Sequence, residues 1–295
     1  MITVQGLTKT FSGGKGIREL TFSVNRGEVF GFLGPNGAGK STTMRHLMGF
    51  MKPDSGEASI CGHDVWKSQG IVQRYIGYLP GEISFIDGMT GLSFLEFMGS
   101  MRGMKDKSKR DRLIRMLQFD ANTPIRKMSK GMKQKVGIVA AFMHDPEVIL
   151  LDEPTSGLDP LMQKLFIELV LEEKARGTTF FMSSHSFPEI ERTCDRAAII
   201  KDGVLVAVKN VHELQSMQRK LFDIVFENRE DAVAFRSSGL PAESVDDFRV
   251  RVAIQGNYND LIRETAKYKI RSLDVFTQNL EDIFMNFYDR EDAQA

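Results

Sequence analysis

The chain has 295 residues, of which 42% are apolar and 26% are charged, and its formal net charge is 0. This length favours one large domain with a smaller one, and the composition is sufficient for a sizeable core. The balanced charge gives no electrostatic case for a nucleic-acid partner, and no apolar run approaches the roughly 18 residues that a membrane-spanning helix needs. The N-terminus lacks the apolar region of a signal peptide, so we expect a soluble cytoplasmic protein with Cys61 and Cys194 as reduced thiols.

A buried strand is predicted at residues 29–33, and the glycine-rich segment after it fits the pattern G-x-x-x-x-G-K-[ST]. Its glycines let successive backbone N–H groups point inward, and the N-terminus of the next helix directs a positive dipole toward a phosphate. We expect Lys40 to supply charge to the β- and γ-phosphates, Ser41 to offer a hydroxyl to Mg²⁺, and Thr42 to contact the phosphate chain. The residues of this phosphate-binding loop are Gly34, Pro35, Asn36, Gly37, Ala38, Gly39, Lys40, Ser41 and Thr42. The loop predicts nucleotide binding without identifying the nucleotide.

Two carboxylates follow a second buried strand. Residues 83–143 are predicted to be mostly helical, and the apolar run at 148–151 then leads directly into Asp152 and Glu153. Ligands of α/β sheets bind at the carboxyl ends of the strands, so we expect Asp152 to hold Mg²⁺, directly or through water. Glu153 would orient and polarise the attacking water, because positioning and electrostatics supply most of the catalysis in phosphoryl transfer. The alternative for Glu153 is an ordinary solvated charge after a strand.

A helix is predicted from Pro160 to the residue before Gly177, and further buried strands are predicted at residues 179–182 and 197–200. Buried strands that alternate with amphipathic helices indicate an α/β fold with a mainly parallel sheet. His185 follows the strand at 179–182 at the same sheet edge, where it could donate a hydrogen bond to the γ-phosphate. A lone histidine is otherwise a structural or solvated residue.

Near residue 215 the pattern changes, and from Leu221 onward a new rhythm of strand, helix and strand begins. This rhythm predicts a small α/β domain at residues 216–295, separate from a first domain at residues 1–215. The last predicted helix places four apolar side chains on one face, as expected for packing. These side chains are Leu280, Ile283, Phe284 and Phe287.

In this order, the segments GPNGAGKST, MSKGMKQK, VILLDEPTSGLD and SSH strongly resemble an ABC-type ATPase cassette, over roughly residues 1–215. The resemblance implies a P-loop fold with a mainly parallel core sheet, an antiparallel β part and a helical insertion at about residues 83–143. ATP is the implied nucleotide, with Mg²⁺ as its metal ion. The implied activity is ATP hydrolysis coupled to transport across a membrane.

The resemblance also assigns residues outside the phosphate-binding loop. Ser129 and Gly131 match the signature motif, which contacts the γ-phosphate held by a second cassette, so two cassettes are implied to close head to tail. Asp159 matches the D-loop residue at that interface, and His185 matches the switch histidine. Phe11 matches the aromatic residue that stacks on adenine, with a core position near a strand end as the alternative.

Two departures from the family pattern stand out. Within the signature, Lys130 and Met132 replace a glycine and a glutamine, changes that backbone contacts and the serine hydroxyl can survive. After IGYLP, the family has a glutamine where this chain has Gly81 followed by Glu82. We expect Glu82 to take over the contacts to metal and water that this glutamine makes; the alternative is weaker coupling.

The variants YLPGE and SKGMKQ, with an added C-terminal part that ends in LEDIF, resemble the ATPase subunits of ABC-2-type exporters. This resemblance implies separate integral membrane permease subunits, a peripheral position at the cytoplasmic face of the membrane, and a dimer of cassettes, for which we expect a homodimer. Coupling helices of the permease would enter a groove beside the helical insertion. Phe85, Ile86, Met89 and residues 94–101 are available to line it, with a helix core as the alternative.

Two other functions are compatible with parts of this pattern. A soluble ABC ATPase that acts on ribosomes or DNA typically carries two cassettes or a long coiled coil, whereas this chain has one phosphate-binding loop and no heptad run. A regulatory subunit without hydrolysis is suggested by Gly81, Lys130 and Met132, but Lys40 and Glu153 argue against it.

Overall fold

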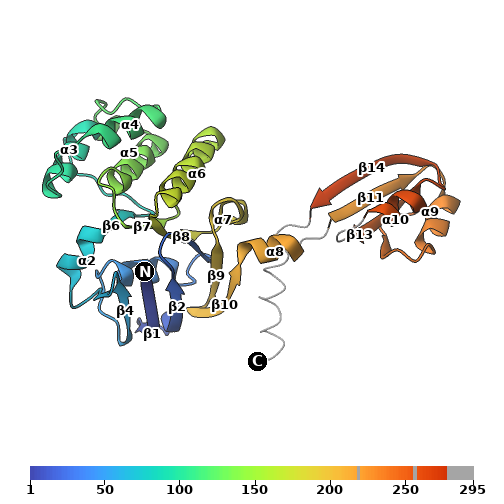
Figure 1. Ribbon diagram of the computed structural model, residues 1–295, viewed down its shortest axis with the longest axis horizontal. Helices are drawn as coiled ribbons and strands as arrows, with labels where there is room; N and C mark the ends of the chain where they lie inside the picture. Colours follow the sequence, from blue (N-terminus) through green and yellow to red (C-terminus); the bar gives the residue numbers. More distant parts are fainter. Residues whose placement is uncertain (218–219, 255–257, 278–295) are drawn as a thin grey trace. The chain divides into compact units, whose positions relative to one another are not determined.

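The computed structural model of the protein describes residues 1–217, 220–254 and 258–277 (Figure 1). The chain folds as two compact units, Met1–Val211 and a second that begins at His212. The apolar stripe predicted at residues 280–287 lies outside the described residues. Within the described residues, no helix is both long and apolar enough to traverse a bilayer.

A six-stranded sheet in the order β10-β9-β3-β8-β7-β6 forms the centre of the first unit. Its strands are β3 (Val29–Leu33), β6 (Ile76–Leu79), β7 (Val148–Asp152), β8 (Thr179–Ser184), β9 (Arg196–Lys201) and β10 (Val204–Asn210). All neighbours pair parallel except β9 and β10, which are antiparallel. Strands β3, β7 and β8 are buried along their whole length, which is why their central residues are apolar. Polar residues of β7 and β8, Asp152 and Ser183 among them, lie at the carboxyl ends of these strands. The four predicted strands and the mainly parallel sheet are confirmed.

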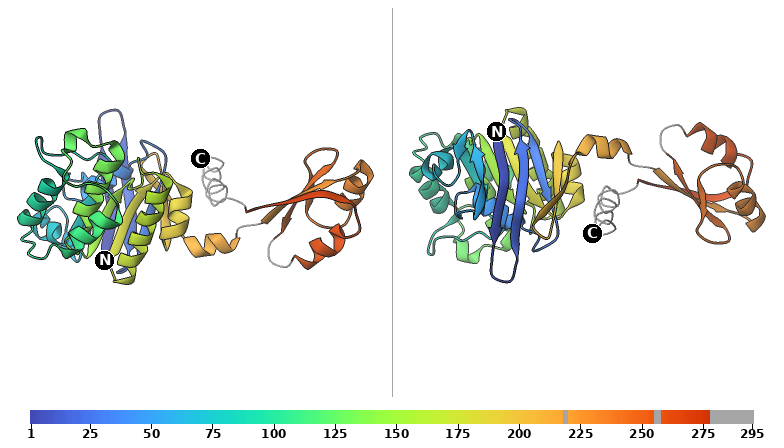
Figure 2. Two further views of the ribbon diagram at one scale, coloured as in Figure 1. Left: turned by 90° about the horizontal axis from the view of Figure 1, so that it is seen from above. Right: turned by 90° about the horizontal axis from the view of Figure 1, so that it is seen from below.

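An antiparallel sheet in the order β2-β1-β4-β5 packs on the central sheet (Figure 2). Its strands are β1 (Ile2–Thr10), β2 (Gly16–Val24), β4 (Ser55–Ile60) and β5 (His63–Asp64). Phe22 of β2 stacks on Phe30 of β3 and Phe181 of β8, with ring centroids 5.6 Å apart in both pairs. Apolar side chains from both sheets therefore share one core, and the antiparallel β part expected from the family resemblance is present.

Helices cover the central sheet and form the insertion. Those of the first unit are α1 (Lys40–Leu47), α2 (Gln69–Tyr75), α3 (Gly91–Met101), α4 (Ser108–Met116), α5 (Lys130–Phe142), α6 (Pro160–Ala175) and α7 (Phe187–Thr193), and α8 (Val211–Met217) follows. Helices α3, α4 and α5 lie together, as the green part of Figure 1 shows. The predicted helical insertion is therefore present, and the helix predicted at Pro160 is α6.

The second unit has an antiparallel sheet in the order β12-β13-β11-β14. Its elements are β11 (Lys220–Phe226), α9 (Arg229–Arg236), β12 (Ala242–Ser244), β13 (Arg249–Ile254), α10 (Asn259–Thr265) and β14 (Ile270–Thr277). Alternate residues of β11, among them Ile224 and Phe226, pack with Phe235 of α9 and Leu261 of α10. The predicted rhythm of strand, helix and strand is confirmed, and β12 is an additional short strand.

Candidate active site

The phosphate-binding loop connects β3 to α1 and bends around the ammonium group of Lys40. Gly37 and Gly39 have φ values of 85° and 110°, a region that side-chain-bearing residues rarely adopt. Lys40 is 6% exposed, and its Nζ donates hydrogen bonds to the carbonyl oxygens of Gly34 at 2.6 Å and Pro35 at 3.2 Å. Burial lowers the pKa of Lys40, while the charges of Glu153 and Asp152 oppose that shift. A buried cation therefore lies at the centre of the loop.

The neighbouring ends of β7 and β8 position the two predicted carboxylates. The parallel register places Asp152 beside Ser183, whose Oγ donates a hydrogen bond to Asp152 Oδ1. The backbone N–H of Glu153 donates to the Ser183 carbonyl at 3.2 Å, and Glu153 has a φ of 49°. Left-handed backbone at a residue other than glycine costs about 1–3 kcal/mol and concentrates at functional sites. Hydrogen bonds to Ser183 therefore fix the end of β7, where both carboxylates lie.

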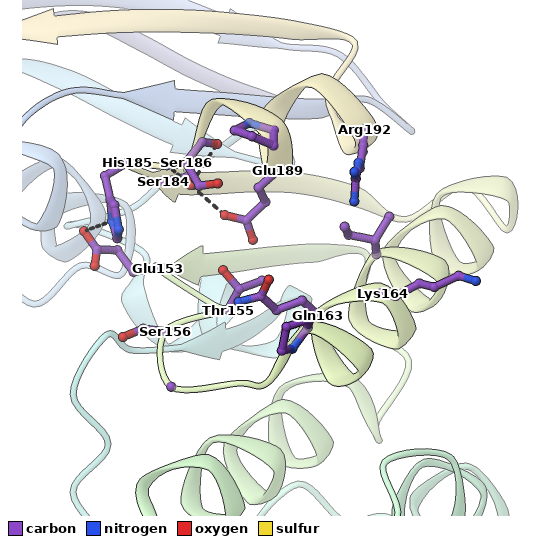
Figure 3. A pocket seen from close by; sticks show the side chains of 14 residues that line it. Glu153, Thr155, Ser156, Gln163, Lys164, Ser184, His185, Ser186, Glu189 and Arg192 are labelled. Atoms are coloured by element: carbon purple, nitrogen blue, oxygen red, sulfur yellow. Dashed lines mark hydrogen bonds and ion pairs between the residues drawn. The ribbon is translucent and has the colours of Figure 1, made fainter. Parts of the chain in front are cut away.

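One oxygen of Glu153 brings three parts of the chain together. Glu153 Oε1 lies 3.8 Å from Lys40 Nζ and 3.3 Å from His185 Nδ1. The Lys40 side chain is 6% exposed and the His185 side chain is 65% exposed. In Figure 3 the side chains of Glu153 and His185, which both line a cavity, point toward each other. The structure thus joins the phosphate-binding loop, the acidic strand end and the histidine that the sequence singled out.

A second cavity of about 260 Å³ lies over the phosphate-binding loop. It is lined by Phe11, Lys15, Gly16, Asn36, Gly37, Gly39, Lys40, Ser41, Thr42 and Glu153. Phe11 is 38% exposed, so the alternative of a core position does not hold. A Cβ on Gly39 would lie 2.7 Å from Ile17 Cγ2, so only glycine fits here. We name this cavity the loop cleft.

The residues around the loop cleft fit a magnesium ion. Ser41 lines the loop cleft, and Asp152 is near enough for its charge to oppose the lowering of the Lys40 pKa by burial. Their hydroxyl and carboxylate oxygens are the ligands that Mg²⁺ prefers. The described residues contain no cluster of three or more His, Cys, Asp or Glu side chains suited to a metal. Mg²⁺ usually takes one or two protein ligands and completes its shell with phosphate oxygens and water. A site with few protein ligands is therefore the kind expected for an ion that arrives with a nucleotide.

Three residues assigned by the family resemblance lie elsewhere. Ser129 and Asp159 cap α5 and α6, each accepting a hydrogen bond from a backbone N–H three residues later, at 3.2 Å and 3.0 Å. Gly131 packs so tightly on residues 156–159, the segment SGLD, that a Cβ would lie 2.8 Å from the carbonyl oxygen of Gly157. In the described part of the chain, the lining of the loop cleft does not include Ser129, Gly131 or Asp159.

The two departures from the family pattern have clear positions. The Lys130 side chain lies beside Gly157, and its Nζ donates a hydrogen bond to Ser156 Oγ at 3.2 Å. A Cβ on Gly81 would lie 3.6 Å from Asp152 Oδ2, so position 81 is the one beside the carboxylate. Glu82 is exposed, and its expected role at the metal stays a prediction.

The sequence did not single out several polar residues that support the site. Ser183 orients Asp152, and Gln134 of α5 donates from Nε2 to the Pro154 carbonyl at 2.7 Å while 4% exposed. Glu189 of α7 is buried and accepts a hydrogen bond from Ser184, the residue before His185. The signal for Gln134 was a polar residue at a core-facing position of a helix. Ser183 had no such signal, because its partner depends on strand register.

Comparisons with known proteins agree with this geometry. Residues 17–156 match the ABC transporter family. The linearmycin resistance ATP-binding protein LnrL of Bacillus subtilis is 31% identical over 98% of this chain and 99% of its own. The bacitracin transport ATP-binding protein BcrA of Bacillus licheniformis is 32% identical over 97% of this chain and 96% of its own. The solved structure of an ATP-binding subunit of an ABC transporter is similar with a TM-score of 0.68 at 31% identity, covering 74% of this chain and 92% of that one.

The sequence and the arrangement of its motifs lead to one family. The relatives match along nearly the whole chain, including the unit that begins at His212. The chain therefore belongs to the ABC transporter family, among the ATP-binding, ATP-hydrolysing subunits of ABC-2-type exporters.

Proposed function

We propose that residues 1–215 form the nucleotide-binding domain and hydrolyse ATP with Lys40, Glu153 and His185, and that this drives export through separate membrane subunits. The observation that carries the proposal is the contact of one carboxylate oxygen of Glu153 with both Lys40 and His185 at the edge of the loop cleft. Residues 216–295 would form an accessory domain.

Each residue around the loop cleft would have a separate task. The Glu153 carboxylate would orient the attacking water and accept its proton, and the His185 imidazole would donate a hydrogen bond to the γ-phosphate. Lys40 Nζ, which now donates to two loop carbonyls, would donate to phosphate oxygens instead. Ser41 and Asp152 would hold Mg²⁺, with Glu82 as a further candidate ligand, and the ion would neutralise charge on the phosphate oxygens.

Phe11 and the signature motif would complete the site from two sides. The exposed ring of Phe11 lines the loop cleft and is available to stack on adenine. Ser129, Gly131 and Asp159 are not part of that lining, which supports a role toward a nucleotide held by a second copy. We therefore infer a head-to-tail homodimer of cassettes that closes on ATP and opens after hydrolysis. Such a cycle needs ATP to favour the closed state, because a ligand shifts an equilibrium only through differential affinity.

The permease subunits would dock beside the helical insertion at the cytoplasmic face of the membrane. A groove of about 580 Å³ lies next to α3 and is lined by Gln73, Arg74, Met98, Met101, Arg102, Met104 and His144. Met101 is 72% exposed, and Ile86 and Phe97 are also exposed, whereas Phe94 and Leu95 are buried as helix core. Relatives named for linearmycin resistance and bacitracin transport support the export direction.

The test replaces the general base while keeping its shape. Glu153→Gln should lower ATP turnover at least about 100-fold, because general-base catalysis contributes roughly 10²–10⁴-fold. ATP binding should persist and a closed dimer should accumulate on size-exclusion chromatography. Glu168→Gln, on the exposed face of α6, is the matched control and should turn over ATP at the wild-type rate. Wild-type turnover in Glu153→Gln would show that the base is assigned wrongly.

A further inference from the structure

A buried carboxyl group lies behind the turn that carries His185. Glu189 is 5% exposed and lies on the first turn of α7. Ser184 Oγ donates a hydrogen bond of 2.6 Å to Glu189 Oε2, and the same Oγ accepts a hydrogen bond of 2.9 Å from the backbone N–H of Ser186. His185 is the residue between these two serines. The hydrogen bonds of Glu189 and Ser184 therefore close the turn on both sides of the histidine.

The imidazole itself has little else to hold it. The side chain of His185 is 65% exposed, so packing restrains it weakly. Among the described residues, its Nδ1 lies 3.3 Å from Glu153 Oε1. In Figure 3 the Glu189 carboxyl group points into the cavity beside Thr155, on the opposite side of Ser184 from His185. The position of the imidazole relative to Glu153 thus depends on the conformation of residues 184–186.

Glu189 has no evident reason to be buried for stability alone. Burial raises the pKa of its carboxyl group, and interactions with the side chains of Ser184, Thr155 and His185 oppose that shift only in part. One oxygen, Oε1, is buried without a hydrogen-bond partner of good geometry among the described residues. A buried carboxyl group with one weakly bonded oxygen is destabilising, and such groups concentrate at functional sites.

We propose that Glu189 is a positioning residue for ATP hydrolysis, which acts through Ser184 to hold His185 against Glu153. The proposal rests on the roles given to His185 and Glu153 above. This role requires an acceptor for the hydrogen bond from Ser184 Oγ at the position of Glu189 Oε2. A displacement of about 1 Å in a catalytic group costs about 100-fold in rate, so loss of this acceptor acts on turnover. Among the described residues, the lining of the loop cleft includes none of residues 184–189, so we expect binding of ATP to change little.

Three variants separate positioning from a general structural role. Glu189→Ala should lower kcat about 10- to 100-fold with KM for ATP changed by less than about threefold, since only the reacting geometry is lost. Glu189→Gln should recover most of the wild-type kcat, because its amide oxygen still accepts from Ser184. Ser184→Ala should lower kcat at least as much as Glu189→Ala, because it also removes the acceptor of the Ser186 N–H. The double variant should be no worse than Ser184→Ala, because both lack the bond between Ser184 and Glu189.

Glu173→Ala is the matched control. Glu173 is 2% exposed in the same unit and forms an ion pair with Lys109 at 2.7 Å, away from the His185 turn. This variant should lower stability but keep kcat, measured per folded molecule. Because Ser184→Ala removes only a hydroxyl group, it tests the proposal even where Glu189→Ala folds poorly.

The outcomes are distinct. A wild-type kcat in Glu189→Ala and Ser184→Ala, with His185→Ala inactive, would overturn this proposal and leave the proposed function standing. Equal losses of kcat in Glu189→Ala and Glu173→Ala, or additive losses in the double variant, would also overturn it in favour of a purely structural role. Wild-type turnover in His185→Ala would remove the proposed role of the histidine and this inference together.

Discussion

Replacing Gly39 with alanine should separate two reasons for a glycine in the phosphate-binding loop. Its φ of 110° would strain any other residue by about 1–3 kcal/mol. The new Cβ would also lie 2.7 Å from Ile17 Cγ2, and Ile17 is 0% exposed, so it has no room to move away. Overpacking of this kind costs about 1–3 kcal/mol more. Gly37→Ala is the matched control, because φ there is 85° and a Cβ would meet nothing within 4 Å.

The assay is urea unfolding followed by tryptophan fluorescence. Trp66 is the single tryptophan of the chain and belongs to the first unit, so its signal reports that unit. Gly39→Ala should be less stable than Gly37→Ala by about 1–3 kcal/mol, the contribution of the steric overlap. ATP affinity should fall in the same order, because the overlap displaces the loop that holds Lys40. Equal midpoints for the two variants would refute the claim that Ile17 determines the residue at position 39.

Two further predictions concern buried carboxylates. Arg251→Ala should lower the free energy of unfolding of the second unit by about 1–2 kcal/mol, a value reduced for solvent screening because Arg251 is half-exposed. Faster hydrogen exchange of the β11 amides would reveal this loss. Hydrogen bonds from Arg251 lower the pKa of Asp223. The loss of stability in Arg251→Ala should therefore be complete at neutral pH and disappear as the pH falls through that lowered pKa. A loss of stability that persists in acid would contradict this prediction. Burial raises the pKa of Glu189, so its ionisation destabilises the fold as the pH rises through that raised pKa. The urea midpoint of Glu189→Gln should therefore be higher than that of the wild type at alkaline pH and equal to it at acidic pH. A gain in midpoint that does not depend on pH would contradict this prediction.

The sequence by itself determined the chemistry that depends on neighbours along the chain. A strand, a glycine-rich loop and a helix in succession define the phosphate site, and the carboxylates after the strand at 148–151 mark the reacting edge. Fully buried strands have continuous apolar runs, so the locations of these strands were predictable. A continuous apolar run does not determine the register of a strand, because it has no alternation of apolar and polar residues to indicate which residues of two strands are paired.

Only the tertiary structure decided which side chains meet. The parallel pairing of β7 and β8 places Ser183 beside Asp152, and the conformation of Glu153 directs one oxygen to both Lys40 and His185. The family pattern also led to the expectation that Glu82 takes over from a missing glutamine, which stays a prediction; the structure adds that Gly81 lies beside Asp152. Contacts between segments far apart in the chain follow from packing and register, which short sequence patterns do not encode.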